Sequence, residues 1–200
     1  MLREIRPAIV LVLSLTIITG LIYPLVMTGI AGVLFPYQAQ GSLIEKDGKV
    51  IGSALIGQEF TSDRYFHSRP SATTGPDPQD PSKTVSASYN AVNSMGSNLG
   101  PTNKALINRV TADVDKLKQE NPSAQVPIDL VTTSGSGLDP DISPAAAYFQ
   151  VPRIAKARNL SEITLRQLVD SHIKERTLGI FGEPHVNVLE LNLALDKAGT

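Results

Sequence analysis

The chain has 200 residues, 42% of them hydrophobic, and its 18 basic and 19 acidic residues give a net charge of −1. It contains no cysteine, which excludes a disulfide framework, a thiolate metal site and a thiol nucleophile. The balanced charge without a basic patch argues against nucleic-acid binding, and the hydrophobic fraction is too high for a disordered chain.

The amino-terminal part holds an apolar segment long enough to cross a membrane. No charged residue occurs between Arg6 and Glu45, and residues 7–35 form an apolar run of 29 residues with a few hydroxyl groups. A bilayer core needs about 20 helical residues. The hydrophobic region of a signal peptide is only about 7–15 residues long and ends at a small-x-small cleavage site, which Phe35-Pro36-Tyr37-Gln38 does not provide. We therefore predict that residues 7–35 form an uncleaved transmembrane helix.

The charges beside this segment predict its orientation. Arg3 and Arg6 precede it, whereas the next basic residue on the other side is Lys46. Basic residues flanking a membrane helix stay on the cytoplasmic side. We expect a single-pass protein of the cell membrane, with residues 1–6 in the cytoplasm and residues 36–200 forming an extracytoplasmic soluble domain.

Small residues within the apolar segment predict a neighbouring helix. Thr16 and Gly20 form a small-xxx-small pair, which lets a second membrane helix approach closely. Pro24, followed by Gly29 and Gly32, is expected to kink or loosen the outer part. We predict packing contacts at Thr16, Gly20 and Pro24, although Gly and Pro are common in membrane helices generally.

The soluble part opens with short, turn-rich elements. Residues 42–45 and 49–56 read as the arms of a hairpin around Asp47-Gly48. Residues 73–84 contain three prolines and no apolar side chain, which predicts a surface loop.

Helical patterns follow. Residues 103–120 are amphipathic, with an apolar face of Leu106, Val110, Val114 and Leu117. Thr102 or Asn103 can cap this helix. Residues 127–132 resemble a short strand. Ser143-Pro144 predicts the start of a helix that runs, with a break near Pro152, to Arg158.

The last segments complete the predicted fold class. Ser161 is expected to cap a helix that ends near Gly179, with His172 as a hydrogen-bonded core residue. Residues 187–197 fit either a strand or a helix, and Asn187 as a cap with the Leu and Ala content favours the helix. The prediction is an α/β (α+β) domain with few strands and several helices, tethered by one transmembrane helix.

No catalytic or metal motif emerges from the residues themselves. The three histidines are far apart, with no zinc spacing, no nucleophile elbow and no phosphate-binding loop that ends in lysine. What remains is a polar, glycine-rich segment, residues 133–144, between the predicted strand and helix. Its amides could cradle an anion, Asp139 and Asp141 could attract a hard cation, or the segment could be a structured turn.

Several short motifs follow one another in order behind the predicted membrane helix. They are Leu55-Ile56-Gly57-Gln58, Tyr65-Phe66, Arg69-Pro70-Ser71-Ala72, Tyr89-Asn90, Gly96-Ser97-Asn98-Leu99-Gly100-Pro101, Asp129-Leu130-Val131-Thr132, Ser134-Gly135-Ser136-Gly137-Leu138-Asp139-Pro140, Ile142-Ser143-Pro144-Ala145-Ala146, Gln150-Val151-Pro152-Arg153, Gly182-Glu183-Pro184, Val186-Asn187-Val188-Leu189 and Leu191-Asn192-Leu193-Ala194-Leu195-Asp196. As an ordered set they resemble the C subunit of the Kdp-type potassium-transporting P-type ATPase. Met95 and Asp141 depart from the family pattern, where a Gly and a His are expected, and residues 73–84 look longer than usual.

The resemblance implies a non-catalytic accessory subunit of an ATP-driven, high-affinity K⁺ uptake complex. Its partners would be a channel-like K⁺-translocating subunit, a P-type ATP-hydrolysing subunit and a small hydrophobic subunit. It would support assembly and act as a catalytic chaperone that raises the affinity of the pump subunit for ATP. The resemblance implies no covalent cofactor, only ATP through the pump subunit. Nucleotide or partner contact would involve Gln58, Ser134, Gly135, Ser136, Gly137 and Asp139.

The predicted orientation conflicts with direct nucleotide contact, because an external domain does not meet cytoplasmic ATP. We therefore expect the domain to dock on the channel-like subunit near the ion entrance. The alternative reading is a membrane-anchored external domain that binds a cation or another solute, for which Asp139 and Asp141 are the candidates. An anchored external enzyme would need a nucleophile and a base that the sequence does not offer.

Overall fold

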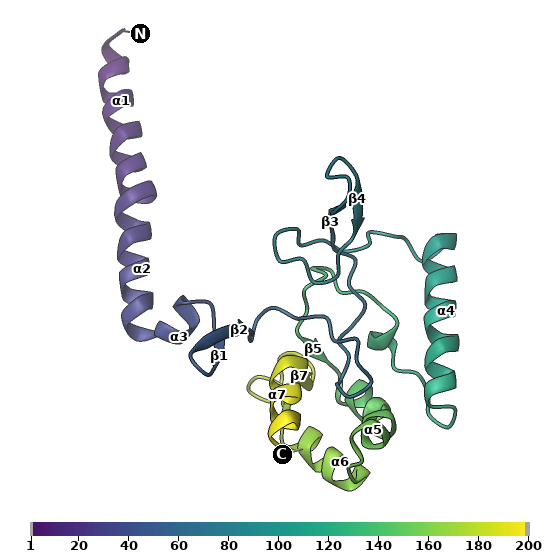
Figure 1. The fold of residues 1–200 in the computed structure, drawn as a ribbon. Helices are drawn as coiled ribbons and strands as arrows, with labels where there is room; N and C mark the ends of the chain where they lie inside the picture. Colours follow the sequence, from purple (N-terminus) through teal and green to yellow (C-terminus); the bar gives the residue numbers. More distant parts are fainter. Residues whose placement is uncertain (1, 199–200) are drawn as a thin grey trace. The chain divides into compact units, whose positions relative to one another are not determined.

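The computed structural model describes residues 2–198 and divides the chain into two compact units, Met1–Ile51 and Gly52–Thr200. Met1, Gly199 and Thr200, which the predicted segments 1–6 and 36–200 include, lie outside the described residues. Figure 1 labels the elements. The first unit contains α1 (Leu2–Ile17), a π-helical turn η1 (Ile18–Ile22), α2 (Tyr23–Leu34), the short α3 (Pro36–Ala39) and β1 (Leu43–Lys46), and β2 (Lys49–Ser53) runs across the boundary.

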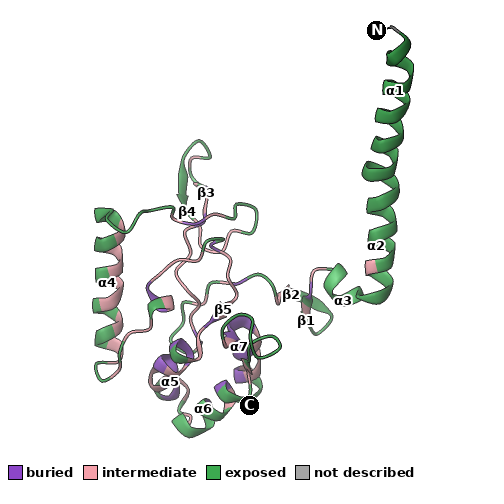
Figure 2. Cartoon of the chain, turned by 180° about the vertical axis from the view of Figure 1, so that it is seen from behind, coloured by how far each residue is buried: buried purple, intermediate pink, exposed green. Residues whose placement is uncertain are grey.

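The amino-terminal helix is apolar on every side. Residues 3–34 form a continuous helix of 32 residues, about 48 Å long at 1.5 Å per residue, and its most apolar stretch of 18 residues has a mean hydropathy of 2.5. Apart from the half-buried Ala31, its described side chains are exposed, as the green helix in Figure 2 shows. Within residues 2–198 it is the one helix whose length and composition would allow it to cross a membrane.

A π turn interrupts this helix directly before Pro24. The N–H of Tyr23 donates to the carbonyl of Ile18, five residues back. Pro24 has no N–H, and in a regular α-helix its ring would clash with the carbonyl of Gly20. The wider turn removes this clash. The irregularity therefore precedes Pro24. We had expected the part beyond Pro24 to be kinked or loosened, but α2 is regular through Gly29 and Gly32.

The predicted hairpin is present as β1 and β2, which form a two-stranded sheet. Asp47 and Gly48 both have positive φ angles, 54° and 74°, as a type I′ turn requires. The second arm ends at Ser53 and not at Ile56. Ser53 and Ile56 instead pair across a tight turn, in which the Ser53 hydroxyl accepts from the N–H of Leu55 at 3.1 Å.

The second unit contains two small antiparallel sheets. One pairs β3 (Thr74–Pro76) with β4 (Thr84–Ser86), so that Thr74 faces Ser86 and Pro76 faces Thr84. The expectation that residues 73–84 are only a loop was therefore wrong: their first residues pair with a strand that begins at the far end of the segment. The other sheet has the order β5-β7-β6 and consists of β5 (Asp141–Ile142), β7 (His185–Asn187) and β6 (Ile173–Lys174).

Helices are the other regular elements of this unit. The predicted caps are confirmed: side-chain oxygens of Asn103, Ser143 and Ser161 accept hydrogen bonds from the first turns of three helices. Asn187 likewise accepts from the N–H of Glu190 at 3.1 Å, which confirms the helical interpretation of residues 187–197. The helices are α4 (Lys104–Glu120), the 3₁₀ turn η2 (Ile128–Leu130), α5 (Pro144–Arg158), α6 (Glu162–Asp170) and α7 (Val188–Ala198).

Three predictions were wrong: the type of one element, a break in one helix and the end of another. Residues 127–132 form the 3₁₀ turn η2 and not a strand, because the carboxylate of Asp129 accepts from the N–H and hydroxyl of Ser143 at 2.7 and 3.1 Å. α5 continues through Pro152, since buried residues on both sides of the proline hold the helix in the core. α6 ends at Asp170, because Ile173 joins the sheet opposite Val186. His172 is half-buried, and its Nδ1 lies 2.8 Å from the carbonyl oxygen of Leu168.

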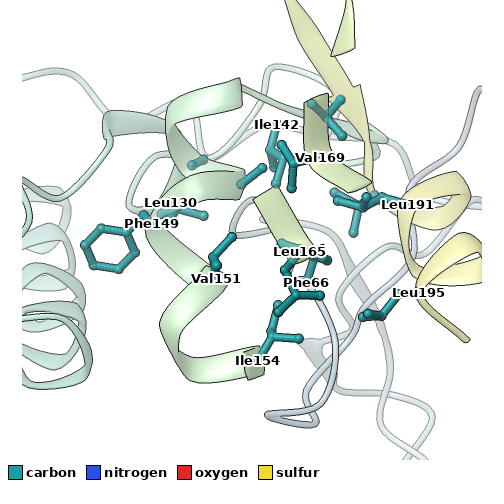
Figure 3. Close-up of a cluster of buried hydrophobic side chains, with 14 of the residues drawn as sticks. Phe66, Leu130, Ile142, Phe149, Val151, Ile154, Leu165, Val169, Leu191 and Leu195 are labelled. Atoms are coloured by element: carbon teal, nitrogen blue, oxygen red, sulfur yellow. The ribbon is translucent and has the colours of Figure 1, made fainter. Parts of the chain in front are cut away.

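The hydrophobic core lies among α5, α6 and α7 and receives Phe66 from a segment without regular secondary structure (Figure 3). Two buried amides hold that segment. Asn192 accepts from the N–H of Phe66 at 2.8 Å and donates to its carbonyl at 2.9 Å. Gln150 does the same for His67, at 2.7 and 3.1 Å. These side chains make the backbone hydrogen bonds that a neighbouring strand would otherwise make. The several helices and short strands of the chain confirm the predicted α+β class.

Candidate functional site

Residues 133–141 of the polar, glycine-rich segment form a loop, which we call the serine-glycine loop. This loop forms one side of an open hollow. Its central contact is an ion pair of 2.9 Å between Nη1 of Arg69 and Oδ2 of Asp139. The same guanidinium donates to the carbonyls of Thr132 and Thr133, at 3.5 and 3.4 Å. Arg69 thus fastens the loop to the segment that carries the Arg69-Pro70-Ser71 motif.

Side chains of the loop accept hydrogen bonds from three of its own backbone N–H groups. Ser134 Oγ accepts from the N–H of Gly137 at 2.9 Å, and Ser136 Oγ accepts from Leu138 at 3.1 Å. Asp139 Oδ1 accepts from the N–H of Asp141 at 3.1 Å. These are short side-chain-to-backbone turns. The amides of Gly137, Leu138 and Asp141 are occupied in this way and are not free to cradle an anion, and these three turns match the structured-turn reading of the segment.

Serines from two other segments donate hydrogen bonds to backbone carbonyls of the loop. Ser71 donates its hydroxyl hydrogen to the carbonyl of Gly137 at 2.7 Å, and Ser94 donates to that of Ser136 at 3.0 Å. Gly137 has a φ of 68°, and a Cβ there would lie 2.5 Å from the carbonyl oxygen of Met95. Only glycine fits this position, because both the conformation and the space exclude a side chain.

Tyr89 locks the adjoining segment in place. Its hydroxyl donates to the carbonyl of Arg69 at 2.8 Å, and its own N–H donates to Ser71 Oγ at 3.0 Å. Its ring lies so close to Gly57 that a Cβ there would be 2.4 Å from Cε1. Burial raises the pKa of Tyr89 to about 12. The phenol therefore stays protonated near neutral pH and acts as a structural donor.

The hollow beside the loop has a volume of about 530 Å³. Among the predicted contact residues, Ser134, Gly135, Ser136 and Asp139 line it, while Gly137 is buried. Gln58 does not line it: its neighbour Gly57 donates its N–H to the carbonyl of Leu138, and the side chain of Gln58 lies against Gly52. The hollow's other lining residues are Leu55, Ile56, Arg69, Thr133, Leu138 and Pro140.

Three residues that organise this site were not among the predicted contacts: Arg69, Ser71 and Tyr89. A signal for each existed, since all three lie in motifs that carried the family resemblance. Their side chains hold segments that are far apart in sequence, and no spacing rule within one segment reveals such contacts.

Neighbouring side chains compete with a cation for the two aspartates. One oxygen of Asp139 is taken by Arg69, and Asp141 Oδ2 lies 3.9 Å from Nε2 of His185. Burial raises the pKa of Asp141, which disfavours the charged form that a cation would need. Across residues 2–198 no group of three His, Cys, Asp or Glu side chains is arranged to hold a metal ion.

A second cleft, of about 490 Å³, lies along α4. It contains the ion pair of 3.0 Å between Arg109 and Asp113, together with Lys116, His67 and Glu120. Burial, helped by the charge of Arg153, lowers the pKa of His67 below its usual 6.5. The acidic and basic groups of this cleft are mixed, so it presents no single-sign surface to a ligand.

The predicted membrane-helix contacts lie in the first unit. Thr16 is in α1, Gly20 is in the π turn and Pro24 is in α2, and all three are exposed. Gly20 has no atom within 4 Å of the position where a Cβ would stand. The open space leaves room for a partner helix to approach there.

Known proteins similar to this chain agree on one family. The family model described as "KdpC: K+-transporting ATPase, c chain" matches residues 5–197. The chain is 76% identical over 198 residues to the potassium-transporting ATPase KdpC subunit of Rhodopseudomonas palustris strain BisB18, covering 99% of this chain and 100% of that protein. It is 75% identical to the KdpC subunit of Bradyrhizobium diazoefficiens and 68% identical to that of Methylobacterium nodulans, covering 98% of each.

Proposed function

Since the chain belongs to the KdpC family, the c chains of K⁺-transporting ATPases, we propose that it is a non-catalytic accessory subunit that an amino-terminal helix anchors in the cell membrane. The apolar helix carries this proposal. A helix of 32 residues with 0% of its most apolar window buried would expose a large apolar surface to water. A bilayer removes that surface from water, and residues 7–35 are the proposed spanning segment.

The proposed orientation has residues 1–6 in the cytoplasm and residues 36–200 outside. Arg3 and Arg6 support it, because basic residues beside a spanning segment resist translocation. In this orientation the serine-glycine loop faces the external medium. The domain would then act on K⁺ entry or on assembly, beside the channel-like subunit.

The proposed partners are the channel-like K⁺-translocating subunit, the P-type ATP-hydrolysing subunit and the small hydrophobic subunit of the same complex. Thr16, Gly20 and Pro24 would supply helix contacts within the bilayer. The exposed Gly20 supports this role, because a residue without a side chain lets two helix backbones approach closely.

We further propose that the chain regulates the ATP-hydrolysing subunit through contacts between subunits and not by holding nucleotide. Two amides of the serine-glycine loop, those of Gly137 and Leu138, are already occupied by serine hydroxyls, which supports this view. Arg69, the cation beside that loop, is already neutralised by Asp139. A triphosphate needs free donors and uncompensated positive charge, and ATP would therefore belong to the pump subunit. A catalytic-chaperone effect would pass through docking.

Purification of the assembled complex tests the proposal. With an affinity tag on the ATP-hydrolysing subunit and a mild detergent, the full chain should co-purify together with the channel-like subunit. K⁺-stimulated ATP hydrolysis should fall when the chain is omitted from co-expression, and the purified chain alone should hydrolyse no ATP. Recovery of a lone chain without integral partners, or ATP hydrolysis by that lone chain, would contradict the proposal.

A further inference from the structure

The connection between β6 and β7 projects an apolar tip, which we call the finger, residues 174–183. Leu178, Ile180 and Phe181 are 84%, 72% and 64% exposed. Three large apolar side chains next to each other at this exposure form a patch, unlike single exposed residues, which are common on protein surfaces.

The turn at the tip holds a leucine in a backbone conformation that leucine rarely adopts. The N–H of Ile180 donates to the carbonyl of Thr177 at 3.2 Å, and the two residues between them, Leu178 and Gly179, have φ angles of 56° and 72°. Turns with two positive φ angles favour Asn-Gly or Asp-Gly. Leucine is disfavoured in this conformation and here also exposes its side chain to water. Such local conflicts concentrate at functional sites.

The frame beneath the tip is well defined. Thr177 and Phe181 exchange two backbone hydrogen bonds, of 2.9 and 3.0 Å. Arg176 and Glu183 form an ion pair across the base, and Lys174 reaches Glu190 of α7 at 2.8 Å. The apolar side chains therefore stand on a preorganised support, which lowers the entropy lost when a partner binds.

We propose that the finger inserts Leu178, Ile180 and Phe181 into an apolar pocket on the channel-like subunit of the same ATPase. The inference rests on the proposed function, since that function supplies a membrane-embedded partner. A small number of buried apolar and aromatic anchors, surrounded by a polar rim, is how protein interfaces concentrate their binding energy.

The charges and composition of the finger favour a protein pocket over a lipid surface. Residues 174–183 contain two basic and two acidic side chains, so the rim is neutral. Segments that bind anionic membranes carry a net positive charge, and residues that anchor at the bilayer interface are enriched in Trp and Tyr. The finger has neither property, whereas a neutral polar rim around an apolar tip fits a protein surface.

Variants of the finger test the docking role. Leu178→Asn should keep the fold, because Asn suits the positive φ angle, and the domain should melt at the wild-type temperature or above. Co-expressed with the other subunits and purified through a tag on the ATP-hydrolysing subunit, Leu178→Asn should reduce recovery of the chain about tenfold relative to wild type, and Leu178→Asn combined with Phe181→Ser further. Ile163→Ser, at a 70% exposed position on α6, is the matched control and should be recovered like wild type.

The outcomes separate this inference from the proposed function. If wild type and Ile163→Ser co-purify while the finger variants do not, docking through the finger is supported. If all of them co-purify equally, the finger inference fails and the proposed function stands. If wild type itself does not co-purify, the proposed function fails.

A fluorescence measurement identifies the surface that the finger meets. The chain has no tryptophan, so Phe181→Trp adds one reporter at the tip, and its emission is read as the difference from a matched sample made with the wild-type chain. In nanodiscs, its emission should shift to shorter wavelength only when the other subunits are present, and brominated lipids should not quench it. A blue shift and quenching with the chain alone in the nanodisc would show insertion into lipid and would overturn the inference.

Discussion

Asn192 offers the sharpest test of how this domain holds its central segment. Its side-chain amide bonds both the N–H and the carbonyl of Phe66, at 2.8 and 2.9 Å, and both residues are buried. Asn192→Leu keeps a side chain of similar size but removes both partners. Phe66 then has two backbone groups in the core without a hydrogen bond.

The size of the effect follows from those two groups. A buried polar group left without its partner costs about 1–3 kcal/mol, so Asn192→Leu should lower the free energy of unfolding by about 2–6 kcal/mol. Domains of this size are stable by about 5–15 kcal/mol, and each kcal/mol corresponds to about 2–4 °C in Tm. The expected fall in Tm is therefore about 4–24 °C.

Thermal unfolding of the full chain in mild detergent, followed by circular dichroism, measures this effect. Asn108→Leu is the control, because Asn108 is exposed on α4; it should change the stability by less than about 0.5 kcal/mol. If Asn192→Leu melted at the same temperature as Asn108→Leu, the amide would not be what holds the Phe66 segment, and the reasoning would be refuted.

Three further predictions concern the serine-glycine loop and the cleft along α4. Gly137→Ala should destabilise the chain by more than about 2 kcal/mol, because it combines a positive φ with a Cβ 2.5 Å from a carbonyl oxygen. Gly135→Ala is the control and should be nearly neutral, since its Cβ meets nothing within 4 Å. Equal melting temperatures of the two variants would contradict the predicted contact. In a double-mutant cycle on the partly buried ion pair, Arg69→Ala and Asp139→Ala should couple by about 1–3 kcal/mol, and strictly additive losses would show that the pair does not stabilise the loop. The pKa of His67 is lowered in the folded chain, so the unfolded chain binds the proton more readily and stability should fall as the pH drops below about 6.5; His67→Gln should flatten that part of the pH profile, and an unchanged profile would argue against this residue.

The elements that the sequence predicts well are those with local signals. Asn103, Ser143 and Ser161 each sit where a cap is needed, and each accepts the expected backbone hydrogen bond. The Asp47-Gly48 turn follows from the conformations that only such residues adopt readily. In these places the determining contacts lie within a few residues of one another, so the pattern alone is sufficient.

The elements that it misses depend on distant partners. η2 looks like a strand by composition, but the bond between Asp129 and Ser143, fourteen residues apart, selects a 3₁₀ turn. Likewise, the end of α6 is decided by the pairing of Ile173 with Val186. A prediction from local propensity cannot include these interactions.

The sequence brought out one loop of the candidate site, but neither the residues that support it, Arg69, Ser71 and Tyr89, nor its arrangement. The motif that contains Ser134, Gly135 and Ser136 does line one hollow with Asp139. Gln58, which the family resemblance grouped with them, points its side chain toward Gly52 instead. The direction of a side chain outside regular secondary structure depends on tertiary packing, and neither a motif nor a spacing specifies it.

The central claim is that an amino-terminal helix anchors a domain on the outer side of the membrane, and the accessibility of introduced cysteines tests it most directly. The chain has no cysteine of its own, so Val92→Cys, at a 95% exposed position of the domain, and Glu4→Cys, in the first turn of α1 and before the proposed spanning segment, each carry a single thiol. In intact cells that assemble the complex, a membrane-impermeant maleimide should label Val92→Cys at once and Glu4→Cys only after permeabilisation. Labelling of Val92→Cys only after permeabilisation would contradict the account.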